Sequence, residues 1–400
     1  MKERHYGMDW LRIGAFQLLI LYHVGMAFVP WDYQIKVATP PIAWATIPMF
    51  LTSPWRLPLL FVVSGYASSA LLAKQDGTMA FLRSRLIRLG IPLLFGMAVI
   101  VVPQPWVWLV THYGYNHGFA YFVAHDYYRF QTIDGVAMPT WMQLWFVAYL
   151  LVYTFTFAVL LTLPNRWRRA GARIVERVLA GPLLLPIGVL WVYLIRTHVG
   201  RGWEESHALV GDWSAHAIYF PAFLFGMALR GSDVLHAAIR RWWSTAAVAA
   251  VIGWLILAAV EFTWPGDAVA PSWVWPLYDM ARPVECWGAI VALIGVADRY
   301  WNIENRWRPM LAEAVFPFYI IHQTIIVVFG YWLLPTATSA VERFTILVSV
   351  TIAGCWAFYL AGRRIDWLRP LIGLSGSAAK ASAGNGSAPT PAASLPETAG

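Results

Sequence analysis

Charged side chains are scarce in this 400-residue sequence, and cysteine is almost absent. Asp, Glu, Lys and Arg together make up 12% of the residues, whereas soluble globular proteins carry about 25%. Hydrophobic residues reach 59%, above the roughly 45–50% of soluble proteins. This balance excludes an ordinary soluble domain and predicts a chain that crosses a lipid bilayer several times.

The two cysteines, Cys286 and Cys355, both lie in apolar runs. Two such residues exclude a disulfide framework and a cysteine-based zinc site. An apolar run of spanning length begins near residue 10 without a small-residue cleavage site, so we expect a first membrane anchor and not a removed signal peptide. The net charge is +8. Because the chain is so apolar, we expect this charge to reflect the orientation of the protein in the bilayer, and we expect no nucleic-acid partner.

Ten apolar stretches are long enough to span a bilayer as helices, which takes about 17–25 residues. They lie near residues 10–29, 56–73, 89–111, 141–163, 178–196, 214–230, 243–262, 280–297, 311–334 and 343–361. With the N-terminus in the cytoplasm, 21 of the 29 Lys and Arg residues fall in inner segments, as the positive-inside rule requires. The sequence therefore predicts an all-α polytopic membrane protein with about ten transmembrane helices and both termini cytoplasmic.

Residues 1–374 form the predicted transmembrane domain. The small, polar and proline-containing stretch 375–400 predicts a disordered tail. Its last six residues, LPETAG, resemble a sortase recognition tag, so an added tag is one explanation for part of this tail.

Arg12 and His23 stand out because ionisable residues within spans are costly and usually functional. Eleven helical residues turn through about 1100°, so the two side chains share one face of the first helix and stand about 16 Å apart along it. The simpler interpretation is that Arg12 reaches the inner interface and His23 bonds a neighbouring helix. Because both residues lie on one stripe, we favour a functional role for the pair.

Two further motifs lie in the second and third spans. Ser64 and Gly65 sit deep in the second span, where a Ser-Gly pair usually marks close helix packing. Arg83, Arg85 and Arg88 precede the third span on the cytoplasmic side. They form either an ordinary positive-inside loop or an anion site, since guanidinium groups bind phosphate bidentately.

Two late spans add isolated polar groups. Glu285 lies at a depth close to that of His23, with Arg282 one turn away. Its carboxylate therefore either orients the imidazole of His23 or pairs with Arg282, and the pair is the simpler interpretation. His322 lies near the middle of the ninth span, where a lone histidine is often a hydrogen bond between helices, so its role stays open.

Outside the membrane, residues 112–141 are rich in Tyr, His and Trp. These side chains form either an interfacial aromatic belt, which we favour, or a surface that holds a sugar. The spacing of His112, His117, His125 and Asp126 fits no standard metal site, and no metal is expected.

Taken together, these motifs resemble the acyltransferase-3 family of integral-membrane acyltransferases. The resemblance rests on Arg12-x10-His23, Phe61-Val-Val-Ser64-Gly65-Tyr66, Arg83-x-Arg85-x-x-Arg88-x-x-x-Pro92, Leu144-Trp145-Phe146 and Tyr319-x-x-His322-Gln323. Within the family, Trp55-Arg56 and Arg88-Leu-Gly-Ile-Pro92 are similar to the glucan biosynthesis protein C branch, which succinylates periplasmic glucans. One departure is Gln143, which stands where many members carry a histidine.

The resemblance implies an acyl-CoA-dependent O-acyltransferase in the bacterial cytoplasmic (inner) membrane. Succinyl-CoA or acetyl-CoA would be the donor, and a hydroxyl of an extracytoplasmic glycan such as a periplasmic glucan would be the acceptor. In this interpretation Arg83, Arg85 and Arg88 hold the CoA phosphates and His23 acts as general base. Arg12 assists with CoA, Ser64 is a candidate donor to the thioester oxygen, and Glu285 and His322 complete the catalytic set.

The residues leave several alternatives open. An acyl-His23 intermediate would serve as well as direct transfer. A transporter or flippase would use Arg12, His23, Glu285 and His322 as a substrate or proton path, although the repeated halves typical of transporters are absent. The sequence identifies neither the acyl group nor the acceptor, and it does not indicate an oligomeric state.

Overall fold

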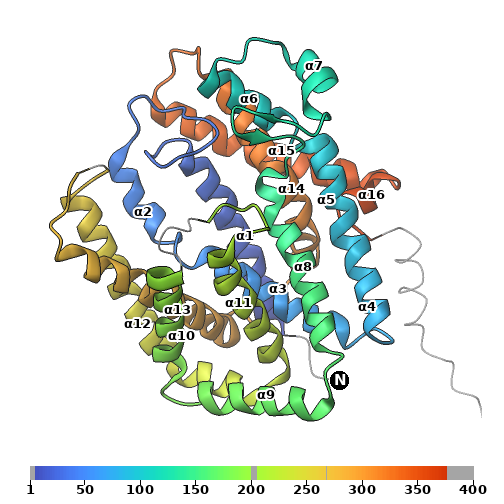
Figure 1. The fold of residues 1–400 in the computed structure, drawn as a ribbon, viewed down its shortest axis with the longest axis vertical. Coiled ribbons are helices and arrows are strands. Elements are labelled where there is room, and N and C mark those ends of the chain that lie inside the picture. The colour runs from blue at the N-terminus through green and yellow to red at the C-terminus, as the bar shows by residue number, and fades with distance from the viewer. Residues whose placement is uncertain (1–4, 200–204, 267, 376–400) are drawn as a thin grey trace, which may run out of the picture.

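The computed structural model describes residues 5–199, 205–266 and 268–375, and its regular structure is almost entirely helical (Figure 1). Within these residues the two strands, β1 (Thr132–Ile133) and β2 (Val136–Ala137), form one small antiparallel hairpin in a loop. The predicted all-α class is therefore confirmed. Apart from Ser375, the predicted tail lies outside the described residues.

Each of the ten predicted stretches lies on a helix or on a chain of joined helical segments. The longer helices are α1 (Tyr6–Met26), α3 (Arg56–Leu72), α6 (Pro103–Tyr113), α8 (Trp145–Leu160), α9 (Asn165–Leu179), α10 (Leu184–Leu194), α11 (Trp213–Gly231), α12 (Asp233–Thr263), α13 (Val274–Tyr300), α14 (Arg308–Leu333) and α15 (Ala340–Arg364).

Shorter elements complete or link these helices. They are η1 (Ala43–Ala45), α2 (Thr46–Phe50), α4 (Thr78–Arg85), η2 (Leu86–Gly90), α5 (Ile91–Phe95), η3 (Gly96–Ile100), α7 (Phe119–Phe122), η4 (Val123–Tyr127), η5 (Met142–Leu144), η6 (Ile195–Val199) and α16 (Leu368–Leu371). Elements η2, η3, η4 and η6 are single π-helical turns, a rare geometry that is frequent at functional sites.

Five helices within the described residues are long and apolar enough to cross a membrane by themselves. Two bent pairs, 78–100 with 103–113 at 46° and 165–179 with 184–199 at 106°, raise the number to seven. Helix α3 is apolar but shorter, and polar side chains such as Asp9 and Arg12 lower the hydropathy of α1. A multi-pass membrane protein is confirmed, while the count of ten spans and the cytoplasmic termini stay predictions.

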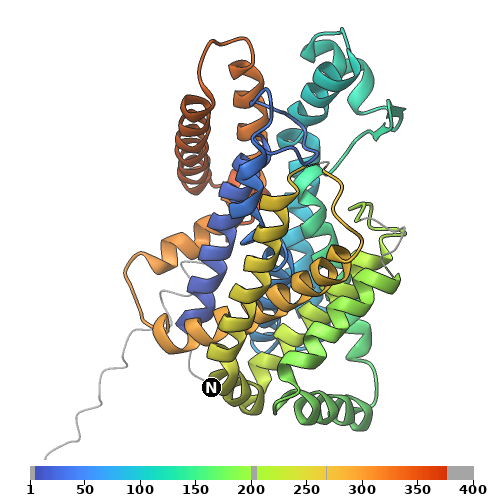
Figure 2. The same cartoon turned by 90° about the vertical axis from the view of Figure 1, so that its left-hand side faces the viewer.

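Helix α9 runs across the end of the bundle, where the start of α1 also lies (Figures 1 and 2). Its sequence carries five arginines, and the apolar side chains Trp167 and Ile174 are exposed. A basic amphipathic helix of this kind lies in the plane of a membrane interface. That the segment around residues 166–177 faces the cytoplasm stays a prediction.

The core of the bundle is aromatic where α3, α8 and α11 meet. The Phe61 ring lies 4.5 Å from the Phe146 ring and 4.7 Å from the Tyr219 ring, measured between centroids. Next to this cluster, Gly65 of α3 and Gly226 of α11 allow the two backbones to touch, as small residues do between membrane helices. The packing role expected for the Ser-Gly pair is therefore present at Gly65.

Candidate active site

Two cavities lie beside α1, one next to Arg12 and Phe16 and the other next to His23 and Met26. We call them the inner and the outer cavity, after the predicted orientation of the chain. The inner cavity, of about 310 Å³, is lined by Arg12, Ser64, Lys74, Arg85, Arg88 and Glu313 among others. The outer cavity, of about 460 Å³, is lined by residues that include His23, Tyr33, Arg56, Trp108, Trp141, Trp145 and Tyr319. The Phe146 side chain lines both cavities and so forms part of the wall between them.

His23 and His322 form a pair of imidazoles at the outer cavity. His322 Nε2 lies 3.2 Å from His23 Nδ1, and the ring centroids are 5.1 Å apart. His322 is fully buried, whereas His23 is half-buried and lines the cavity. The structure thus joins two predicted site residues from α1 and α14 that are 299 residues apart in the chain.

The hydrogen bonds of this pair define the tautomer of each neutral ring. His322 Nδ1 lies 2.8 Å from the carbonyl oxygen of Tyr319, which only accepts, so Nδ1 carries the proton. His322 Nε2 is then an acceptor, and the partner atom, His23 Nδ1, must donate. The remaining nitrogen, His23 Nε2, therefore holds a lone pair and is the basic atom of the pair.

A buried amide network fixes the segment that carries His322. Gln143 Nε2 donates to the carbonyl oxygen of Ile320 at 2.9 Å, and Gln104 Nε2 donates to Gln143 Oε1 at 3.1 Å. Gln104 also donates to Thr324 Oγ1 at 2.7 Å. Gln143 therefore links η5 to α14 through its side-chain amide.

The inner cavity gathers two of the three predicted phosphate-binding arginines. Arg85 and Arg88 line it together with Arg12 and Lys74, and Arg85 also donates to the hydroxyl of Ser68. Arg83 is exposed and does not line this cavity. Its side chain points away because residues two apart on a helix face different sides.

Ser64 and Arg12 lie with this basic group and not with His23. Both line the inner cavity, where Arg12 Nη2 also donates to the carbonyl oxygen of Ala312 at 3.3 Å. Among the described residues, the acidic side chain on this cavity wall is Glu313, which lies 3.8 Å from Arg363 Nε and 3.9 Å from Arg369 Nη2. The cavity therefore keeps an excess of positive charge.

Glu285 meets neither of its two expected partners. It is 1% exposed on α13, and in the part of the chain that the structure describes neither carboxylate oxygen has a hydrogen-bond partner. Neither a hydrogen bond to His23 nor an ion pair with Arg282 forms among those residues, and Glu285 lines neither cavity along α1. The geometry gives this side chain no direct part in orienting the imidazole.

Arg56, at the start of α3, is a further site residue outside the predicted catalytic set. It is 5% exposed, and its guanidinium carbon lies 3.3 Å from the centroid of the Tyr22 ring. Within the described residues, Nε and Nη1 have no hydrogen-bond partner. A buried cation with free donors that lines the same cavity as His23 is suited to stabilise negative charge.

The histidines and tyrosines of the outer loop form aromatic stacks. The ring of Tyr121 is stacked between those of His117 and His125, with centroids 4.2 and 4.3 Å away. Tyr115 donates its hydroxyl to Asp126, and this bond and burial raise the pKa of Tyr115. His112 instead lies 2.9 Å from the hydroxyl of Thr111.

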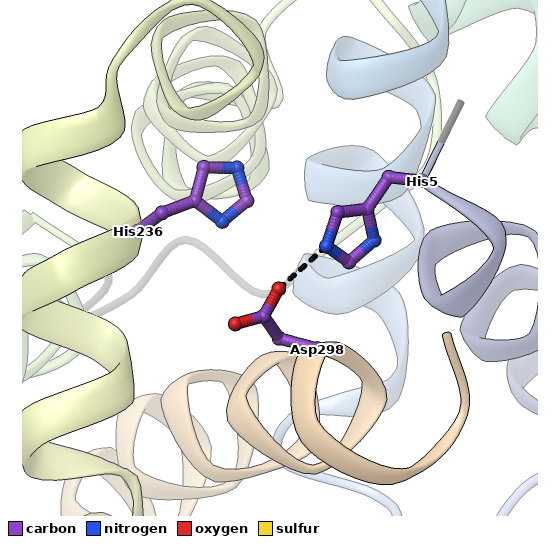
Figure 3. Close-up of side chains that lie close together, drawn as sticks. All are labelled: His5, His236 and Asp298. Carbon is purple, nitrogen blue, oxygen red and sulfur yellow. Dashed lines mark hydrogen bonds and ion pairs between the residues drawn. The ribbon is translucent and has the colours of Figure 1, made fainter. Parts of the chain in front are cut away.

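One group of possible metal ligands lies elsewhere, at the start of α1 (Figure 3). One donor atom each of His5, His236 and Asp298 lies within 4.8 Å of the others, and His5 Nε2 is 2.5 Å from Asp298 Oδ1. Arg240 pairs with the same carboxylate at 3.3 Å, so a nearby positive charge opposes a bound cation. The contacts of Asp298 with His5 and Arg240 thus link α13 to the N-terminal end and to α12.

Comparisons with known proteins agree with this architecture. A family model described as an acyltransferase domain, acyltransferase-3, matches residues 5–360. Glucans biosynthesis protein C of Salmonella gallinarum is 20% identical over 358 residues, covering 85% of this chain and 87% of the relative.

Two further relatives share that name over a shorter segment. The proteins from Escherichia coli O6:K15:H31 and Shigella dysenteriae serotype 1 are 25% identical over 152 residues. Each match spans 38% of this chain and 37% of the relative's length. No solved structure matches. Because the family model matches residues 5–360, nearly the whole described bundle, this chain belongs to the acyltransferase-3 family of membrane acyltransferases.

Proposed function

We propose that this protein is a membrane-embedded O-acyltransferase that moves an acyl group from cytoplasmic acyl-CoA to a hydroxyl of an extracytoplasmic glycan. The observation that carries the proposal is the pair of cavities along α1, one lined by cations and the other by the His23 imidazole. The name of the relatives, Glucans biosynthesis protein C, supports a glucan as the acceptor. Their bacterial origin supports the bacterial cytoplasmic (inner) membrane as the location.

The inner cavity suits the phosphate groups of CoA. Arg12, Lys74, Arg85 and Arg88 line one space, and charge-assisted bonds from such groups to phosphate are strong. The acyl-pantetheine arm would then pass along the wall at Phe146 toward His23. No metal is needed for this arrangement, and the acyl group is succinyl or acetyl.

The outer cavity suits a sugar hydroxyl. Trp108, Trp141 and Trp145 line it together with Asp32, so apolar faces and a carboxylate surround the space beside His23. Aromatic side chains offer flat apolar surface to a sugar ring, and a carboxylate accepts hydrogen bonds from its hydroxyl groups. This combination favours a carbohydrate acceptor over a purely apolar one.

The proposed reaction follows from the tautomer of His23. The acceptor hydroxyl gives its proton to His23 Nε2 while its oxygen attacks the thioester carbonyl carbon. The carbon–sulfur bond then breaks, and the departing CoA thiolate takes up the proton, which leaves an ester on the glycan and free CoA thiol. Arg56 faces the cavity where the oxyanion forms and is better placed than Ser64 to stabilise it.

Purified protein in nanodiscs should release CoA thiol from succinyl-CoA or acetyl-CoA only when a glucan is present. Mass spectrometry of the glucan should show the added acyl mass. Transport of intact glucan into vesicles without a mass change would contradict the proposal and favour a flippase.

Neutralising the inner arginines should weaken donor binding more than chemistry. We expect Arg85→Gln and Arg88→Gln each to raise the KM for acyl-CoA about tenfold, because a lost charge-assisted hydrogen bond costs about 1.5–3 kcal/mol. The measurement is initial rate against acyl-CoA concentration. Arg83→Gln is the matched control, since Arg83 lies outside the cavity. Equal KM values for all three variants would rule out the phosphate site.

Removing His322 should lower kcat because His23 loses the acceptor that selects its tautomer. We expect His322→Phe to lower kcat about tenfold to a hundredfold, the usual loss when a group that orients an imidazole is removed. The KM for acyl-CoA should stay close to that of the wild type. His322→Gln, whose amide oxygen also accepts a hydrogen bond, should recover part of the rate. A KM effect with unchanged kcat would show that His322 serves binding instead.

A further inference from the structure

A third cavity, of about 380 Å³, adjoins the outer cavity on the side of α11 and α13. The two cavities share lining from Tyr22, Arg56, Leu57 and His207. We call this third space the side cavity. The side cavity therefore lies beside the place where the acyl group and the acceptor hydroxyl would meet.

Three arginines line the side cavity: Arg56 from α3, Arg196 from η6 and Arg282 from α13. Arg196 and Arg282 approach this space from two different elements. Arg282 Nη1 donates to the hydroxyl of Tyr278 at 3.2 Å, but Arg282 Nε and Arg56 Nε and Nη1 have no hydrogen-bond partner among the described residues. Several strong donors are thus gathered around one space.

The acidic residues nearby leave most of this positive charge unmatched. Glu205 lines the cavity, but its carboxylate accepts a bond from the Tyr219 hydroxyl at 2.7 Å and lies 3.8 Å from His207 Nε2. Glu285, one turn from Arg282, does not line the cavity and forms no ion pair among the described residues. Among the described residues that line this cavity, three arginines therefore share one engaged carboxylate. Like charges gathered around one space repel each other unless an anion joins them.

We propose that the side cavity binds a carboxylate carried by one of the two substrates, with Arg196 and Arg282 as its specificity-determining residues. The proposal rests on the acyltransferase function above. A guanidinium fork matches a carboxylate bidentately, and Arg56 connects this subsite to the cavity that holds His23. The carboxylate comes either from the far end of a dicarboxylic acyl group or from an acidic substituent of the glycan.

A turnover experiment with paired substrates distinguishes the two sources. The donor arm compares succinyl-CoA with butyryl-CoA, which has a methyl group in place of the carboxylate. The acceptor arm compares a glucuronate-bearing glucan with a neutral one. For each pair we compare kcat/KM for the acidic substrate with kcat/KM for its neutral counterpart. In the pair that contains the true source of the carboxylate, the wild type should favour the acidic substrate. This preference should fall at least about tenfold in R196Q/R282Q. Arg299→Gln, an exposed arginine on α13 outside the cavity, should keep the wild-type ratio.

A binding experiment tests the subsite independently of turnover. Monomethyl succinate, but not dimethyl succinate, should raise the thermal midpoint of the wild type in tryptophan fluorescence, and R196Q, R282Q and the double variant should lose this shift. If no acyl-CoA is turned over but the shift is lost in the variants, the acyltransferase proposal fails and the anion site stands. The anion site would be overturned by two results together. The first is that the variants keep the wild-type kcat/KM ratios in both the donor and the acceptor experiment. The second is that monomethyl succinate shifts the thermal midpoint of wild type and variants equally or not at all.

Discussion

Replacement of His23 by alanine is expected to lower the rate of acyl transfer about a thousandfold, within the range that a positioned general base supplies. The reason is that His23 Nε2 is the free basic nitrogen of the imidazole pair. His322 cannot take over, because it is fully buried and its Nδ1 is engaged with the carbonyl oxygen of Tyr319. The measurement is transfer of a labelled acyl group from acyl-CoA to glucan under saturating substrate.

The same experiment needs proof that the variant is folded. Cys286 and Cys355 are free and buried, so a thiol-reactive dye that reacts with them on unfolding reports stability without an introduced cysteine. We expect His23→Ala to keep a thermal midpoint close to that of the wild type. His198→Ala is the matched control, because His198 is exposed and lines neither cavity along α1. A folded His23→Ala protein with a rate within about threefold of the wild type would contradict the role of His23.

The placement of Arg12 and His23 could be derived from the sequence because it depends on one helix. The spacing of eleven residues decides which face of an α-helix they share, whatever the helix packs against. The structure has both residues on α1, with Arg12 at the inner cavity and His23 at the outer one. Local periodicity was sufficient for this part of the site.

The partner of His23 could not be derived in the same way. His322 is 299 residues away, and only the packing of α14 against α1 brings the rings together. A single sequence does not show how deep two distant helices lie in the bundle or which faces they turn toward each other. For the same reason, Glu285 could be placed near the depth of His23, but its rotation away from the imidazole could not be foreseen.

Arg83 shows a different limit. The sequence groups it with Arg85 and Arg88 because the three are close in the chain, yet only the latter two line the inner cavity. Arg83 and Arg85 are two residues apart on α4, so their side chains face different sides, whereas Arg85 and Arg88 are three residues apart and share one side. Closeness in the chain therefore does not decide which arginines line one space.

The number of spans depends on how bent and polar helices are counted. All ten predicted stretches are helical, but α1 carries the charged groups of the candidate site and α3 is short. Those are the helices that line the cavities, where polar side chains face protein instead of lipid. Hydropathy identifies most clearly the helices that face lipid, such as α12 and α15, in which few residues are buried.

Adding a methyl group at Gly65 is expected to separate α3 from α11 and to prevent assembly of the bundle. A Cβ atom at Gly65 would lie 1.9 Å from the backbone oxygen of Phe223, and one at Gly226 would lie 1.9 Å from that of Val62. Backbone atoms of packed helices cannot rotate aside, so both helices would have to shift. We expect Gly65→Ala and Gly226→Ala each to destabilise the protein by about 3 kcal/mol or more, the upper range for overpacking.

The matched control is Gly14→Ala on α1, where an added Cβ meets no atom within 4 Å. There alanine should be neutral or stabilising by about 0.5–1 kcal/mol, because it favours the helix over glycine. The measurement is the thermal midpoint reported by the buried cysteines in detergent, with the yield of monodisperse protein as a second readout. If all three variants unfold at the wild-type temperature, the close contact between α3 and α11 is absent, and with it the packing that positions Ser64 on the wall of the inner cavity.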